Sequence, residues 1–284
     1  MYGETMWQKL TDSDVRDRLE RMRLPFNRYG LDPYGISRDH LGFVFSILAP
    51  VYRHYFRVQV HGTHNIPQEG RGMVIGNHSG GIPVDAAMVL ASVFFEMEPP
   101  RLLHGMVEKF AQNWPMLSPM FNRMGQLPGL PQHAVRLLRD ERLLMIFPEG
   151  VRGIGKLYKD RYQTRRFGTG FMRIALQTES PIIPFAFIGG EEAYPTLWHL
   201  KPLARLLGAP YVPVPAHIVP VPLPIRCSIH YGEPMNFDGN GSESDDVIAT
   251  YVSEVRERVD ELIAEGRVER RERLIREQAG RVEG

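Results

Sequence analysis

A histidine and an aspartate stand where a short apolar segment gives way to a turn, at His78 and Asp85. A hydroxyl group is a weak nucleophile at neutral pH and needs a base within hydrogen-bonding distance to attack an acyl thioester. Histidine suits this role, and a neighbouring carboxylate fixes its tautomer and stabilises the imidazolium that forms. The two residues therefore predict a general base and its orienting carboxylate. The alternative is that Asp85 only caps the first turn of a helix.

Small residues follow His78 in the turn that leads to Asp85. Gly80 and Gly81, which come directly after Ser79, let the backbone approach a ligand closely. Exposed N–H groups at the start of a helix can stabilise a developing oxyanion. We therefore expect the backbone amides of these three residues to hold the oxyanion of the reaction.

A second polar turn follows a later apolar segment, in Phe147-Pro148-Glu149-Gly150-Val151-Arg152. Within it, Glu149, Gly150 and Arg152 are predicted to bind the acceptor, since a guanidinium recognises oxyanions with paired hydrogen bonds. Nearby cations are predicted to contact phosphates of coenzyme A or of a lipid headgroup, although a run of charge is also typical of a solvated face. These cations are Lys109, Lys156, Arg165 and Arg166.

Alternating strands and helices must position these two turns. The predicted elements are strands at 58–62, 72–76, 102–106, 143–147, 181–188 and 225–231 and helices at 85–96, 134–140 and 171–178. This alternation predicts an α/β fold with a mixed, largely parallel central sheet flanked by helices. In such sheets ligands bind at the carboxyl ends of strands, where both turns lie. Residues 1–57 are predicted to be a helical N-terminal extension, and residues 58–284 the functional domain.

Two segments depart from this alternation. Residues 201–224 are rich in proline, which is expected to prevent a regular helix and to exclude an inner strand. They are predicted to form either a covering loop or a lipid-facing lid. Residues 243–265 are predicted to be a helix, and the Arg- and Glu-rich sequence from Gly266 onward a solvated helix end or a frayed tail.

Composition narrows the range of partners. The 284-residue chain has a net charge of +1, so no overall field recruits nucleic acid. The single cysteine, Cys227, excludes an internal disulfide and fits a reducing compartment. Met1 to Leu10 lacks the basic start and apolar run of a secretory signal. No metal site is predicted, because the sequence shows no close-set histidine, cysteine and carboxylate cluster beyond the pair described above.

The longest apolar segment, residues 41–52, is shorter than the roughly 18–20 residues that a membrane-spanning helix needs. This length suits either a buried core helix or an interfacial one. The aromatic and basic residues at 52–57 favour the interface, because such side chains are stable at headgroup depth. The sequence therefore predicts peripheral or monotopic contact with a membrane surface.

The chain resembles the lysophosphatidate acyltransferase (PlsC-like) superfamily of glycerolipid acyltransferases. The resemblance runs from about Val58 to Tyr231 and rests on three blocks, which are Asn77-His78-Ser79 with Asp85, Phe147-Pro148-Glu149-Gly150 with Arg152, and Pro181-Ile182-Ile183-Pro184. It implies an O-acyltransferase of lipid metabolism at the cytoplasmic face of a membrane. The implied donor is acyl-CoA, with acyl carrier protein the less favoured alternative, and the implied acceptor is a lipid hydroxyl. No permanently bound cofactor is implied.

Two features depart from the family pattern. The family usually places four residues between the histidine and the aspartate, whereas six intervene here, including Pro83. Members specific for lysophosphatidate carry a phosphate-binding arginine in their second block, and the corresponding residues 125–132 contain no cation. The chain therefore resembles the branch that acylates neutral or glycosylated lipid alcohols. Two other functions stay open, a lipid-binding pseudoenzyme whose lengthened loop abolishes catalysis and an acyl-thioester hydrolase.

Overall fold

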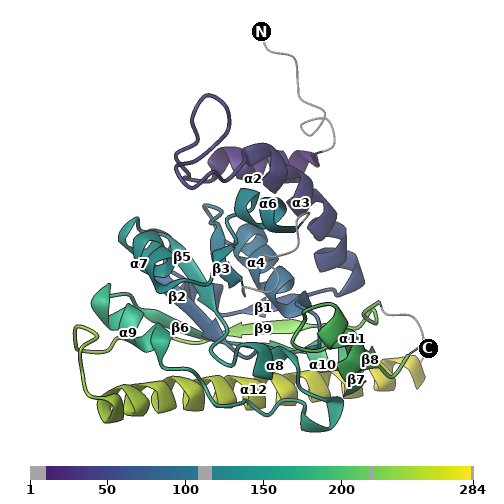
Figure 1. Cartoon of the computed structure of the whole chain (residues 1–284). Coiled ribbons are helices and arrows are strands. Elements are labelled where there is room, and N and C mark those ends of the chain that lie inside the picture. Colours follow the sequence, from purple (N-terminus) through teal and green to yellow (C-terminus); the bar gives the residue numbers. More distant parts are fainter. Residues whose placement is uncertain (1–10, 108–116, 218–220, 283–284) are drawn as a thin grey trace.

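A seven-stranded sheet forms the centre of the computed structural model (Figure 1), which describes residues 11–107, 117–217 and 221–282. The strand order is β1-β9-β6-β2-β5-β3-β4. Neighbouring strands from β6 to β4 run parallel, β9 runs antiparallel to β6, and β1 is parallel to β9. The predicted mixed, largely parallel sheet is confirmed. The strands are β1 (Gln59–His61), β2 (Gly72–Gly76), β3 (Leu103–Val107), β4 (Leu127–Pro128), β5 (Leu143–Ile146), β6 (Ile182–Ile188) and β9 (Ser228–Tyr231).

Helices cover both faces of the sheet, because alternate side chains of a strand point to opposite faces. In the buried strand β2, Val74 belongs to the apolar core under α2 (Ser13–Arg21), α3 (Arg38–Pro50) and α4 (Val84–Glu96). Met73 and Ile75 belong to the core on the opposite face, under α7 (Pro131–Arg139), α9 (Gly170–Gln177) and α12 (Asp245–Val282). Figure 1 shows α12 on the side of the sheet away from α2, α3 and α4. Shorter helices are the π-helix η1 (Val51–Tyr55), α6 (Leu117–Arg123), α8 (Val151–Ile154), α10 (Gly190–Ala193) and the 3-10 turns η2 (Thr63–Asn65) and η3 (Tyr158–Asp160).

The helical N-terminal segment is confirmed, and it packs as part of the core. Helix α3 buries Leu41, Phe45 and Ala49, and the ring of Phe45 stacks on Phe94 of α4 with centroids 3.8 Å apart. Within the described residues, every helix falls short of the length and apolar character that a membrane crossing requires. The division of the chain at residue 57 stays a prediction.

The proline-rich segment contains regular structure, so the prediction that residues 201–224 form no helix is wrong. Helix α11 (Lys201–Leu206) carries Pro202 in its first turn, where a missing N–H leaves no helical hydrogen bond unmade. Strand β8 (Pro213–Pro215) pairs antiparallel with β7 (Thr196–His199). These two strands form a sheet of their own, so each is an edge strand, the position in which proline is tolerated.

The C-terminal helix is longer than expected. Helix α12 continues without a break past Gly266, so the alternative of a frayed tail from that residue is wrong. Charged side chains of this part of α12 hydrogen-bond to the edge of the sheet. Arg270 Nη1 donates to the carbonyl of Arg226, just before β9, and Arg273 Nη1 donates to the side chain of Gln59 in β1. A charge-rich sequence therefore stays helical where its side chains reach the strands below.

A buried histidine in β3 predicts acid sensitivity. His104 is fully buried, its Nδ1 donates to the Gly125 carbonyl at 3.1 Å, and burial together with the charge of Arg142 lowers its pKa from 6.5 to about 3. In the unfolded chain His104 therefore takes up a proton below about pH 6.5, whereas in the folded chain it stays neutral down to about pH 3. We expect the unfolding free energy to fall with pH in that window by up to ~1.4 kcal/mol per pH unit.

Urea unfolding at several pH values, compared between the native chain and His104→Gln, isolates this contribution. The two pH dependences should diverge below about pH 6.5. Parallel curves would show that His104 titrates alike in both states.

Candidate active site

The predicted catalytic pair is in direct contact. His78 Nδ1 donates to Asp85 Oδ2 at 2.7 Å, at the carboxyl end of β2 and the first turn of α4. The Asp85 carboxylate is fully buried and also accepts the backbone N–H groups of Ser79, at 2.6 Å, and of Ala86, at 2.7 Å. These three donors fix the carboxylate. Because Nδ1 carries the shared proton, the Nε2 of His78 is left as the acceptor that a general base requires.

The ring of His78 is held from its other side by Phe147. The two rings stack with centroids 4.0 Å apart and an interplanar angle of 16°. The His78 side chain is 13% exposed, and its Nε2 has no hydrogen-bond partner among the residues that the structure describes. Phe147 ends the strand segment before the second polar turn, so the two turns meet at this ring. Only the apolar character of the strand end hints at this contact in the sequence.

Two successive glycines explain how six intervening residues still place Asp85 beside His78. Gly80 and Gly81 have φ of +88° and +68°, the left-handed region that costs other residues strain. They fold the extra length into a bulge that closes before Pro83 and Val84 begin α4. The wider spacing therefore does not separate the pair.

The predicted oxyanion amides differ in availability. The N–H of Ser79 is bonded to Asp85, and that of Gly81 donates to the Ile154 carbonyl at 3.0 Å. Only the N–H of Gly80 lacks a hydrogen-bond partner in the described part of the chain. The hydroxyl of Ser79 is buried and likewise has no partner there. Of the three predicted amides, the Gly80 N–H is therefore the one left without a partner, whereas the Ser79 hydroxyl is enclosed against Gly190.

Replacing Gly81 with alanine should disturb this loop. The residue needs a positive φ, and an added Cβ would lie 2.5 Å from Thr196 Oγ1 and 3.1 Å from the Tyr194 ring. We expect a loss of unfolding free energy greater than ~1 kcal/mol, together with lower activity because the loop carries Asp85. Urea unfolding measures the first effect. Gly170→Ala is the stability control, since its Cβ would meet no atom within 4 Å, and equal stability of both variants would contradict the expectation.

Glu149 is buried and links the two turns. Its Oε1 accepts the backbone N–H of His78 at 3.0 Å, and its Oε2 accepts the backbone N–H of Arg165 at 2.7 Å. Both oxygens are engaged inside the protein, so the predicted part of Glu149 in acceptor binding acts through the backbone of the two turns. Its contacts make it a positioning residue. Gly150 follows with φ +56° and ψ −146°, a conformation that glycine adopts readily, and begins α8.

Lys156 is also buried, with 1% of its side chain exposed. Its Nζ lies 3.4 Å from Glu149 Oε2 and 3.8 Å from Glu191 Oε1. The prediction that it contacts a ligand phosphate is wrong, since the ammonium is enclosed by these two carboxylates. Glu191 belongs to α10 and was not predicted, and its burial raises its pKa to about 7. Lys156 therefore neutralises charge beneath the site.

The remaining predicted cations lie at the surface beside the second turn. Arg152 lines an open pocket of about 430 Å³ formed by residues 146–152, Gly168, Gly170 and Phe171. Its Nη2 donates to the Arg166 carbonyl at 3.3 Å. Arg166 is exposed, and no partner of its side chain occurs in the described residues, whereas the guanidinium of Arg165 pairs with Asp160 at 2.8 Å. Lys109 lies outside the described residues.

The third sequence block supports the site from the neighbouring strand. Pro181-Ile182-Ile183-Pro184 leads into β6, which pairs in parallel with β2. Asn77, between β2 and His78, donates to the Phe187 carbonyl at 3.0 Å and accepts the Phe187 N–H at 2.8 Å. This buried amide continues the β2–β6 ladder by one residue and fixes the backbone from which His78 projects.

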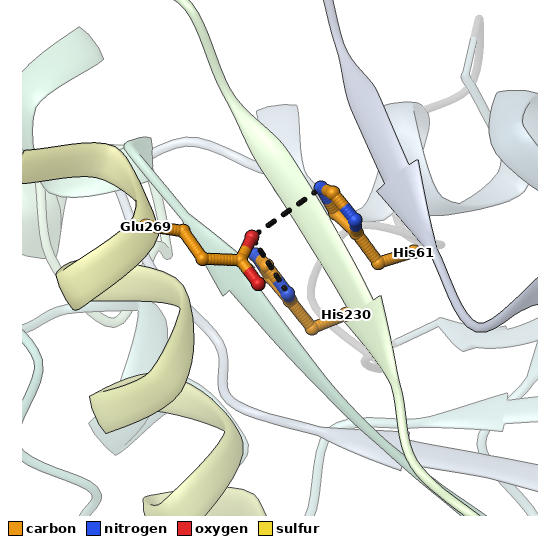
Figure 2. A group of neighbouring side chains, drawn as sticks. All are labelled: His61, His230 and Glu269. Atoms are coloured by element: carbon orange, nitrogen blue, oxygen red, sulfur yellow. Dashed lines mark ion pairs between the residues drawn. The ribbon is translucent and has the colours of Figure 1, made fainter. Parts of the chain in front are cut away.

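A second cluster of histidine and carboxylate groups lies at the edge of the sheet (Figure 2). Glu269 Oε2 is 3.5 Å from His61 Nε2 and 3.9 Å from His230 Nδ1. The prediction that no such cluster exists beyond the catalytic pair is therefore wrong. The sequence does not reveal the cluster because its members come from β1, β9 and α12, which are far apart in the chain. The two imidazoles stack in parallel, with centroids 4.6 Å apart. A metal lies in the plane of each ring that binds it, so stacked rings cannot share one without rotating.

Comparison with known proteins agrees with the geometry. A family model described as Acyltransferase matches residues 57–188. An uncharacterized protein of Mycobacterium tuberculosis H37Rv is 35% identical over 248 residues, which cover 84% of this chain and 68% of that protein. A Gallus gallus protein described as "DGAT1/2-independent enzyme synthesizing storage lipids" is 28% identical over 218 residues, which cover 72% of this chain and 63% of that protein.

The fold also has a relative of known structure. The crystal structure of the 1-acyl-sn-glycerophosphate (LPA) acyltransferase PlsC from Thermotoga maritima matches 88% of each chain with a TM-score of 0.51 and 18% identity. The chain therefore belongs to the PlsC-like acyltransferase superfamily, as a divergent member. Its acyltransferase domain spans residues 57–188.

Proposed function

We propose that the protein transfers a fatty acyl group from acyl-CoA to a hydroxyl of a glycerolipid or related lipid alcohol, with His78 as general base. The observation that carries the proposal is the 2.7 Å contact between His78 Nδ1 and Asp85 Oδ2, with Nε2 left open. A pseudoenzyme is disfavoured, because the lengthened loop keeps this contact. The enzymes of Gallus gallus and Homo sapiens described as synthesising storage lipids support a lipid acceptor.

In the proposed reaction His78 Nε2 removes the proton of the acceptor hydroxyl as its oxygen attacks the thioester carbonyl carbon. Asp85 stabilises the imidazolium that forms. The negative charge on the carbonyl oxygen of the tetrahedral intermediate is stabilised by the Gly80 N–H. The intermediate then collapses, the carbon–sulfur bond breaks, and the imidazolium returns its proton to the departing thiolate. The products are an ester and free coenzyme A, and no metal or resident cofactor takes part.

Arg152 and Arg166 are proposed to bind a phosphate, either of coenzyme A or of the acceptor headgroup. Both are exposed beside the pocket that adjoins Phe147. Replacing both with glutamine should raise the KM of the phosphate-bearing substrate about tenfold, which corresponds to ~1.4 kcal/mol. The substrate whose KM rises identifies the phosphate. The charge-matched control is Lys159→Gln with Arg161→Gln, and unchanged KM values for both substrates would remove the two arginines from the site.

The proposed partners are acyl-CoA, a lipid acceptor and the cytoplasmic face of a membrane, with acyl carrier protein the less favoured donor carrier. The absence of a cation in residues 125–132 favours a neutral or glycosylated acceptor over lysophosphatidate.

The test of this function is incubation of the purified chain with radiolabelled acyl-CoA and a panel of lysophospholipids, diacylglycerol and glycolipids. We expect label in one class of acylated lipid. Label only in free fatty acid would replace the proposal with thioester hydrolysis. Label that stays in acyl-CoA with every acceptor would favour the pseudoenzyme.

A further inference from the structure

Exposed apolar side chains are concentrated in one segment. Of the sixteen large apolar side chains exposed in the described residues, eight lie between Leu197 and Leu223, about a tenth of the chain. Trp198 is 53% exposed and Leu206 81%. Exposed apolar side chains gathered in one segment mark a contact with a partner or a membrane more often than isolated exposed residues do. The members from β7 through α11 are Leu197, Trp198, Leu200, Leu203, Leu206 and Leu207.

The charge of this region is one-sided. Residues 193–232 contain no aspartate or glutamate, although the whole chain has 33 acidic residues in 284, which predicts about five in such a stretch. The same stretch carries Lys201 and Arg205 in α11, both exposed. An apolar surface with a basic rim and no acidic residues is complementary to an anionic lipid surface, in which leucine and tryptophan side chains enter the headgroup region and cations meet phosphates.

The segment that carries these side chains packs against the loop between His78 and Asp85. A Cβ added at Gly81 would lie 2.5 Å from Thr196 Oγ1 of β7, and one added at Gly155, after α8, would lie 3.1 Å from the Tyr211 ring. Figure 1 shows α11, β7 and β8 gathered beside α8 and α10, the elements that surround the site. The inner side of the segment therefore packs against the loop that carries His78, while its outer side is apolar.

The far end of the segment is fixed to the N-terminal helices. Tyr55 donates its hydroxyl proton to the Pro222 carbonyl at 2.6 Å, and Arg57 Nη2 donates to the Pro224 carbonyl at 2.9 Å. Val221 and Leu223 are exposed beside these bonds. The apolar surface is thus held at both ends, so it can insert as a formed unit.

We propose that the surface of residues 197–207 with Val221 and Leu223, which we call the lipid-facing surface, docks this enzyme on an anionic bilayer. The inference rests on the proposed acyl transfer to a lipid, because it explains how an acceptor reaches His78 without leaving the membrane. A second copy of this chain fits the surface less well. A symmetric dimer would bring the same patch of each chain together, with Lys201 and Arg205 and no acidic partner.

The test is flotation of the full chain with vesicles of phosphatidylcholine, with and without phosphatidylglycerol. The native chain should float, and more strongly with phosphatidylglycerol. Trp198→Ser with Leu206→Ser should weaken binding at least tenfold. The matched control is Val268→Ser with Ile275→Ser, a pair 57% exposed on α12, which should bind as the native chain does. Lys201→Glu with Arg205→Glu should abolish the preference for phosphatidylglycerol.

Activity on a detergent-solubilised acceptor separates this inference from the function beneath it. The Trp198→Ser, Leu206→Ser variant should keep the native rate in detergent and lose rate only on vesicles. Equal flotation of this variant and the native chain would overturn the docking proposal while leaving the acyltransferase function standing. A native chain that is a dimer in solution, with a variant that is a monomer, would also overturn the docking proposal, since the surface would then bind a second copy.

A native chain that floats normally but is inactive in detergent would overturn the proposed acyl transfer and leave the docking proposal standing. Thermal unfolding checks that each variant is folded.

Discussion

Replacement of His78 with alanine should lower kcat for acyl transfer about 10²–10⁴-fold, the range typical of a lost general base. The physical reason is that no other described side chain offers a base at the open Nε2 position, and Asp85 is fully buried behind the ring. The fold should survive, since the Asp85 carboxylate keeps the backbone N–H groups of Ser79 and Ala86 as donors when the imidazole is removed. The measurement is kcat with saturating acyl-CoA, together with the urea unfolding curve of the same preparation.

A double-mutant cycle with Asp85→Asn tests whether the two residues act as a unit. Asp85 works through the imidazole, so once His78 is alanine the second substitution should cost little more activity. Asp85→Asn alone should lower kcat strongly, because an asparagine cannot stabilise an imidazolium as a carboxylate does. Losses that multiply in the double variant would mean that Asp85 acts independently of His78.

Replacement of Glu149 with alanine should have the largest effect on stability, a loss of ~3–5 kcal/mol of unfolding free energy. The change leaves the buried Lys156 ammonium without its nearer partner, and it leaves the N–H groups of His78 and Arg165 without their acceptor. Activity should fall with it, because the His78 backbone loses its support. Urea unfolding at neutral pH measures the effect.

The control for this expectation is an ion pair at the surface. Glu261 pairs with Arg258 at 2.9 Å on α12, with 63% of its side chain exposed, so Glu261→Gln should cost less than ~1 kcal/mol. Glu149→Gln should fall between the two, since the amide oxygen retains one acceptor. Equal losses for Glu149→Ala and Glu261→Gln would show that the buried network carries no special share of the stability.

Much of the fold around the site could be predicted because local pattern and tertiary role agree there. Strand β2 was expected at residues 72–76 and forms at Gly72–Gly76, since an unbroken apolar run between turn residues suits an inner parallel strand. Helix α4 begins within one residue of its predicted start, behind Pro83. The His78–Asp85 contact was also expected, because both residues belong to one turn.

The failures concern partners that only the tertiary fold brings together. Glu149 and Lys156 look like surface groups in the sequence, and Glu191, which completes their buried cluster, comes from the turn after another strand. The many prolines in residues 201–224 argue against a strand, yet β8 forms there because it pairs with β7 in a two-stranded sheet, where an edge strand tolerates proline. The His61–Glu269 contact joins β1 to α12, which lie far apart in the sequence, so no local pattern predicts it.

The central claim is that His78 drives acyl transfer to a lipid hydroxyl. The measurement that tests it most directly follows free coenzyme A and acylated lipid in the same reaction, for the native chain and for His78→Ala. We predict that the native chain releases one coenzyme A for each acylated lipid, and that both products are lost together in the variant. Equal rates of lipid acylation by the two proteins would contradict the account.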